Sequence, residues 1–150
     1  MGTSIVSPKS KTLVPDTTSA DDNSIAAAQT PGGASNLTLL ATALTFAPTG
    51  VGLFVTVTGD GGTDLRATNF TITGTNALGI SASEVLAGPN GAATVTSTLK
   101  YNTVTQIAVS GGTTTAVRAG NAAGSGGSEQ TIFAGRTRLR ELFGTTAGTA

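Results

Sequence analysis

The stretch FTITGTNALGISASEVLAGPNG, residues 70–91, carries polar side chains at every second position and is interrupted twice by glycine-containing turns. A period of two is typical of a β-strand with one buried face and one exposed face. In the first half of the stretch, Phe70 and Ile72 are predicted to point into a core. The run GTNALG then predicts a turn, because glycine and asparagine tolerate the backbone angles of tight turns.

The second half of the stretch is predicted to return as a neighbouring strand. Its first inward-facing side chains are expected to be Ile80 and Ala82. The alternation then changes phase at Glu84 and Val85. A β-bulge near Ser83 is the simplest explanation, since one extra residue shifts every following side chain to the other face.

The run GPNG, residues 88–91, predicts a further turn, because proline fixes its φ angle and glycine permits a positive one. The next strand is expected to face the core through Ala93, Val95 and Leu99. The whole region therefore predicts a meander of tight hairpins.

Short strand-like segments continue on both sides of this region, and no convincing helix lies among them. Threonine (29 residues) and glycine (21 residues) are abundant while aromatic residues make up 4%, which favours strands and turns. About eight short strands predict an all-β fold, an antiparallel β-sandwich or small barrel. The segments are NLTLL (36–40), ALTFA (43–47), VGLFVTVTG (51–59), NFTITG (69–74), GISASEVLAG (79–88), AATVTSTL (92–99), TVTQIAVS (103–110) and TTTAVRAG (113–120).

The chain is predicted to have three parts. Residues 1–30 lack a sustained apolar period and are expected to form an extended N-terminal arm. Residues 31–120 are expected to form the sandwich, and residues 121–150 a Gly/Ser linker followed by a C-terminal docking arm. Large apolar residues in the two arms are candidate contacts with another subunit. These candidates are Ile25, Ile132, Phe133, Leu139, Leu142 and Phe143.

Composition argues against several function classes. The chain has no histidine, cysteine or tryptophan and a single tyrosine, so the usual nucleophile and base pairs and the commonest zinc ligands are missing. We therefore expect no enzyme activity, no cofactor and no small-molecule substrate. The net charge is zero, which gives no attraction to nucleic acid or to an anionic membrane. The first residues lack an apolar run of signal-peptide length, so we expect no export by the usual route.

The run GDGGTDL, residues 59–65, resembles one copy of a calcium-binding nonapeptide repeat, with Asp60 and Asp64 as possible ligands. Such repeats bind calcium by stacking, because each turn shares its ions with the next, and this chain has one copy. The alternative is a glycine-rich loop whose acidic residues face solvent.

Three segments taken together resemble a group of small threonine- and glycine-rich virion proteins of tailed bacteriophages. They are IAAAQTPGGASNLTL (25–39), FTITGTNALGISASEVLAGPNG (70–91) and YNTVTQIAVSGG (101–112). The shared pattern runs from a strand ending in Thr-Gly-Thr, through a strand bearing a glutamate, to Gly-Pro-Asn. The matching residues are Gly74, Thr75, Glu84, Gly88, Pro89 and Asn90.

The resemblance covers about residues 25–120 and implies a structural virion protein, above all a capsid decoration or cement protein on the outside of the assembled phage head. It implies the major capsid protein as partner, a homotrimer, a location on the virion capsid surface and synthesis in the host cytoplasm. It implies no catalytic residues. Deletion of residues 1–24 is expected to weaken capsid attachment and to leave the sandwich folded.

Two other functions stay open. A phage tail or head-tail connector component shares the β-sandwich and low charge, and a hexameric ring would favour it. A bacterial surface or adhesion module is a more distant alternative, because it would normally have an export signal or repeated copies of the domain.

Overall fold

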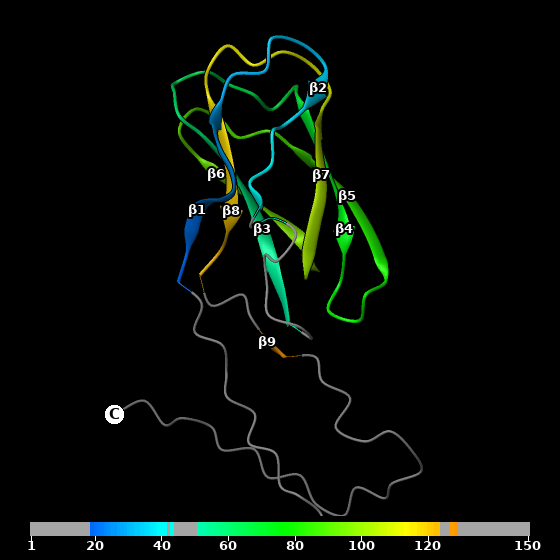
Figure 1. The fold of residues 1–150 in the computed structure, drawn as a ribbon. Helices are drawn as coiled ribbons and strands as arrows, with labels where there is room; N and C mark the ends of the chain where they lie inside the picture. Colours follow the sequence, from blue (N-terminus) through cyan, green and yellow to red (C-terminus); the bar gives the residue numbers. More distant parts are fainter. Residues whose placement is uncertain (1–18, 42, 44–50, 124–126, 129–150) are drawn as a thin grey trace, which may run out of the picture.

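The computed structural model describes residues 19–41, 43, 51–123 and 127–128. These residues form two antiparallel sheets that lie face to face (Figure 1). The described part of the chain contains no α-helix. The predicted all-β sandwich is therefore confirmed.

One sheet has the strand order β1-β8-β3-β6, with the short strand β9 paired to β3 outside this order, and the other has the order β2-β7-β4-β5. The strands are β1 (Asp21–Gln29), β2 (Ser35–Asn36), β3 (Val51–Gly59), β4 (Asn69–Thr75), β5 (Ser81–Ala87), β6 (Thr94–Tyr101), β7 (Thr103–Val109), β8 (Val117–Asn121) and β9 (Gly127–Ser128).

The core lies between the two sheets and draws side chains from both. Tyr101 of β6 and Phe70 of β4 are its largest fully buried members, and Ile72 and Ile107 of the second sheet are also fully buried. The inward orientation predicted for Phe70 and Ile72 is confirmed. Because few aromatic residues are available, most of the remaining core consists of β-branched and leucine side chains.

Residues 21–29 form a strand, so the prediction of an arm over residues 1–30 is wrong for this part. β1 pairs antiparallel with β8, with Asp21 opposite Asn121 and Gln29 opposite Val117. Ile25 and its neighbour Ala26 are both fully buried. Register shifts along β1 place these two adjacent residues inside, and this hid the period of two from sequence analysis.

The bulge predicted near Ser83 is absent, since β4 and β5 pair residue by residue from Asn69 opposite Ala87 to Thr75 opposite Ser81. The inward side of β5 carries Ala82, Glu84 and Leu86, whereas Ile80 and Val85 are exposed. The prediction that Ile80 faces the core is therefore wrong. Ile80 precedes the first residue of β5, and the false bulge arose because Glu84 occupies an inward position, which imitates a change of phase.

A bulge occurs instead in β6. Phe54 of β3 pairs with Lys100 and Thr56 pairs with Thr96, so β6 holds two more residues than β3 over this interval. The extra residues turn Leu99 outward, where it is 42% exposed. The predicted inward orientation of Leu99 is wrong for this reason.

The predicted meander of hairpins is also wrong for most connections. Only the β4–β5 connection joins neighbours in one sheet among the described strands, whereas β5 to β6, β6 to β7 and β7 to β8 cross between sheets. The GPNG run does not close a hairpin. It pairs with the loop before β4, where Leu65 N donates to Pro89 O and Gly91 N donates to Thr63 O.

Candidate functional site

The sandwich has one end at which the chain passes into residues outside the described part. Ser19 and Ala20 lead into β1 there, β3 begins there at Val51, and β8 ends there at Asn121 (lower end in Figure 1). Asn121 links the end of β8 to the residues that precede β1, because its Nδ2 donates to Ser19 O at 2.9 Å. We call this end of the sandwich the connection end.

A groove opens at the connection end between β5 and β6. It has a volume of about 320 Å³ and lies between β3, the β4–β5 turn and the bulged part of β6. Its lining residues are Gly52, Phe54, Asn76, Ala77, Ala82, Thr98, Leu99 and Lys100. The ammonium group of Lys100 lies 5.2 Å from the centre of the Phe54 ring, so the positive charge stacks on an aromatic face at one wall of the groove.

The β4–β5 turn presents apolar side chains beside this groove. Leu78 is 60% exposed and Ile80 is 58% exposed. The turn is ordered by Asn76, whose Oδ1 accepts hydrogen bonds from Leu78 N at 2.9 Å and Ile80 N at 3.0 Å. Gly79 has a φ of 76°, which glycine adopts without strain. The turn therefore exposes two large apolar side chains in a fixed conformation.

Glu84 of β5 connects the two sheets next to the groove, because its carboxylate binds Thr98 and Leu99 of β6. We call this junction between β5 and β6 the seam. The Glu84 carboxylate accepts hydrogen bonds from Thr98 N at 2.8 Å, Thr98 Oγ1 at 2.8 Å and Leu99 N at 2.9 Å. Thr98 and Leu99 belong to the β6 bulge, so their N–H groups do not follow the regular pairing with β3. Within the bulge, Ser97 Oγ accepts from Val55 N and donates to Leu99 O. Glu84 and Ser97 thus supply the hydrogen bonds that the bulge removes from the sheet.

The environment of Glu84 shifts two pKa values. Partial burial opposes ionisation of Glu84, but the hydrogen bonds from Leu99 and Thr98 outweigh it and hold its pKa below the ordinary value. Burial, together with the nearby charge of Glu84, raises the pKa of Tyr101 to about 12. The Tyr101 hydroxyl is buried and has no hydrogen-bond partner in the described structure. Of these two groups, Glu84 supports the seam, because its carboxylate accepts hydrogen bonds from β6.

The acidic residues of the calcium-like motif are each paired with an arginine. Asp64 accepts from Arg66 Nη2 at 2.8 Å, and its hydrogen bonds to Arg66 lower the pKa of Asp64 to about 2. Asp60 forms an ion pair with Arg118. Asp60 and Asp64 thus pair with different arginines, and the described residues contain no group of three or more His, Cys, Asp or Glu side chains that could hold a metal ion.

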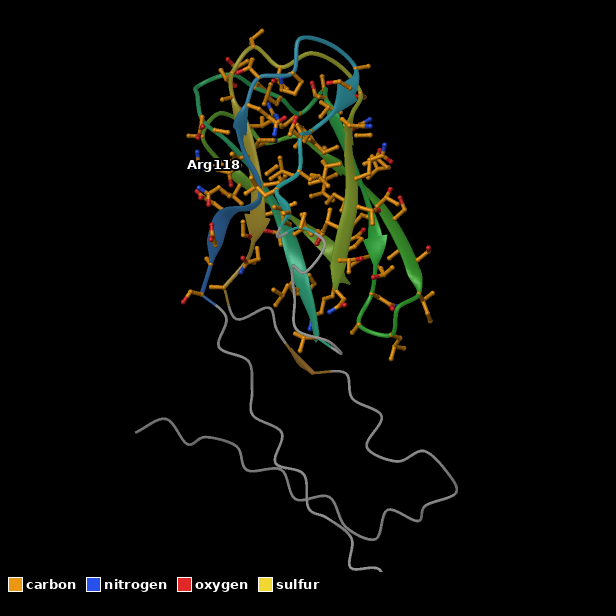
Figure 2. The ribbon with its side chains drawn as sticks, in the orientation of Figure 1. Arg118 is labelled. Carbon is orange, nitrogen blue, oxygen red and sulfur yellow. The ribbon has the colours of Figure 1, made fainter. Side chains whose placement is uncertain are left out.

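Arg118 also joins β1 to the loop after β3. It projects from the outer side of the first sheet (Figure 2), and its Nε donates to Asp22 Oδ2 at 2.7 Å. The side chain of Arg118 is 26% exposed, compared with 66% for Arg66. The ion pairs of Arg118 with Asp22 and Asp60 are therefore better shielded from solvent than the ion pair of Arg66 with Asp64. They connect β1 to the loop that follows β3.

The candidate subunit contacts fall into two groups. Ile25 is fully buried in the core of its own chain, so its prediction as an intersubunit contact is wrong. The others, Ile132, Phe133, Leu139, Leu142 and Phe143, lie outside the described residues. Sequence analysis did not identify the exposed pair Leu78 and Ile80 as a contact surface, and it placed Ile80 in the core as the first inward residue of the next strand. The GTNALG turn itself was predicted, and its last residue, Gly79, was the signal that Ile80 stands at the turn and not inside the following strand.

Comparisons with protein-family models, with curated proteins and with solved structures found no match for this chain. Among the described residues, no helix is long and apolar enough to cross a membrane.

Proposed function

We propose that this protein is a structural virion protein of a tailed bacteriophage, a capsid decoration or cement protein that binds the outside of the assembled head. One observation carries the proposal beyond the resemblance of the sequence: the groove and the exposed Leu78 and Ile80 lie at the same end of the sandwich as the connections to both terminal segments. This arrangement gives a compact body with one adhesive end.

A decoration protein stabilises a shell by binding the assembled state in preference to loose subunits, since binding to one state shifts the equilibrium towards it. Such a protein needs a stable body, a contact surface and segments that reach neighbours. The sandwich, the connection end and residues 1–18 and 129–150 are suited to these three tasks. The major capsid protein is the proposed partner, and a homotrimer on the virion surface is the proposed assembly.

Immunogold electron microscopy of phage particles from a lysate of the source culture tests the proposal. Antibody raised against the purified chain is expected to label capsids. Label on tails would favour the tail or connector component, and label on cell envelopes with none on particles would favour the surface module. A variant lacking residues 1–18, added back to particles without the protein, is expected to attach more weakly than the full chain.

A further inference from the structure

We propose that the groove at the connection end receives residues 129–143 of a second copy of this chain. The inference rests on the proposed homotrimer and adds the surface that holds it together. It assigns a donor segment and an acceptor site to each subunit.

The groove is suited to large apolar side chains. Phe54, Ala77, Ala82 and Leu99 contribute apolar surface, and the ammonium group of Lys100 lies over the Phe54 ring at one wall. Leu99 is 42% exposed because the β6 bulge turns it away from its own core. Leu78 and Ile80 are exposed on the same β4–β5 turn whose Asn76 and Ala77 line the groove. No other part of the described chain covers these two side chains, which are both more than half exposed.

The C-terminal segment has the matching chemistry. Residues 129–143 carry five large apolar side chains within 15 residues, and they follow a glycine-rich linker. These side chains are Ile132, Phe133, Leu139, Leu142 and Phe143. A segment of this composition gains by burying its apolar side chains against apolar groups of the groove such as Phe54 and Leu99.

The direction of β9 favours a second copy as the recipient. Gly127 pairs with Gly52 and Ser128 pairs with Val51, so β9 runs antiparallel to β3. The chain therefore passes the edge of its own groove at Gly52 and leaves Ser128 in the direction away from Phe54. Fifteen extended residues span about 50 Å, which is enough to reach a neighbouring sandwich.

Donation of a segment from each subunit to the next is also compatible with a closed ring of subunits. The donor segment and the acceptor groove are different surfaces, so each contact is head-to-tail, and such contacts close into a cyclic assembly when the rotation between subunits permits. In the proposed trimer, every subunit donates one segment and accepts one.

Cysteine cross-linking tests the exchange, because the natural chain contains no cysteine. Full-length Ala77→Cys and full-length Phe133→Cys are prepared separately, mixed, allowed to exchange and oxidised under mild conditions. We expect a covalent heterodimer on non-reducing gels, with a disulfide between the two positions identified by mass spectrometry. The control mixture pairs Phe133→Cys with Thr105→Cys, an exposed position on β7 outside the groove, and is expected to give at least tenfold less heterodimer.

Three outcomes would overturn the inference. One is equal cross-linking in the two mixtures. Another is an exclusively intramolecular disulfide in the double variant Ala77→Cys/Phe133→Cys, which would place the segment in its own groove. The third is an unchanged oligomer, measured by light scattering, for a chain that ends at Ser128. These experiments use purified protein, so a negative cross-linking result can be told apart from a negative capsid-labelling result. If antibody labels capsids but the subunits do not exchange segments, the further inference is wrong and the proposed function still stands.

Discussion

Replacement of Glu84 by alanine should measure how much the seam between the two sheets contributes to stability. The change removes one carboxylate that accepts hydrogen bonds from two backbone N–H groups and one hydroxyl. Hydrogen bonds to charged groups contribute about 1.5–3 kcal/mol each when shielded, but Thr98 and Leu99 are partly exposed and water can replace the lost acceptor. We therefore expect a total loss of about 2 kcal/mol in the free energy of unfolding.

Thermal unfolding followed by circular dichroism provides the first measurement. For a domain of this size, a loss of about 2 kcal/mol corresponds to a fall of about 10 °C in Tm. Glu84→Gln keeps one acceptor oxygen but turns an amide N–H group towards the donors of β6, so its Tm should lie between those of Glu84→Ala and the natural protein. The matched control is Asp64→Asn. It removes a carboxylate whose partner Arg66 is 66% exposed, and it should leave Tm nearly unchanged.

The pH dependence gives an independent check of the same reasoning. The pKa of Glu84 is lower in the folded chain than its ordinary value of 4.5. A lowered pKa contributes stability that is fully present above the unfolded value and is lost as the pH falls through the folded value. The difference in Tm between the natural protein and Glu84→Ala should therefore be constant from pH 7 to about pH 5.5 and shrink towards pH 3. Equal Tm values at pH 7, or an undiminished difference at pH 3, would refute the role assigned to Glu84.

Three further changes test other parts of the structure. Ile25→Ala removes a fully buried side chain and should lower the free energy of unfolding, measured with urea, by about 2–5 kcal/mol; a change below about 0.5 kcal/mol would place Ile25 outside the core. Tyr101→Phe removes a buried hydroxyl that has no partner in the described structure, so urea unfolding should show stability that is unchanged or higher by about 1 kcal/mol, and a clear loss would reveal a hydrogen bond. Deletion of residues 1–18 should leave Tm unchanged, whereas deletion of residues 1–24 removes the start of β1 and Asp22, the partner of Arg118, and should lower it; equal Tm values would show that this part of β1 is dispensable.

The pairing of β1 with β8 changes how deletions of the N-terminal region should be designed. From sequence, residues 1–24 are a removable arm, yet Asp21 to Gln29 pair along β8. Gly120 shows how closely the two strands approach, because a Cβ atom there would overlap the carbonyl oxygen of Asp21. An attachment defect in a chain lacking residues 1–24 would therefore combine loss of contact with loss of folding. The cut before residue 19 separates them.

The sequence by itself determined the class of fold and the position of most strands. Alternation of apolar and polar residues located β4 and most of β3, β6 and β7, since a strand with one buried face must repeat every two residues. The inward positions of Phe70 and Ile72 followed from the same rule. Local pattern is sufficient for β4 because its residues alternate between buried and partly exposed positions along the whole strand.

Only the tertiary structure decided where the pattern is broken and which strands are neighbours. The two adjacent buried residues of β1 and the two extra residues of β6 depend on pairing with strands far away in the chain. In the sequence, Glu84 interrupts the alternation of apolar and polar residues in β5. In the structure it is an inward residue whose carboxylate accepts hydrogen bonds from Thr98 N and Leu99 N in the β6 bulge of the opposite sheet. The groove at the connection end exists for the same reason: its walls come from β3, β5, β6 and the β4–β5 turn, and contacts between segments so distant in sequence leave no local period to read.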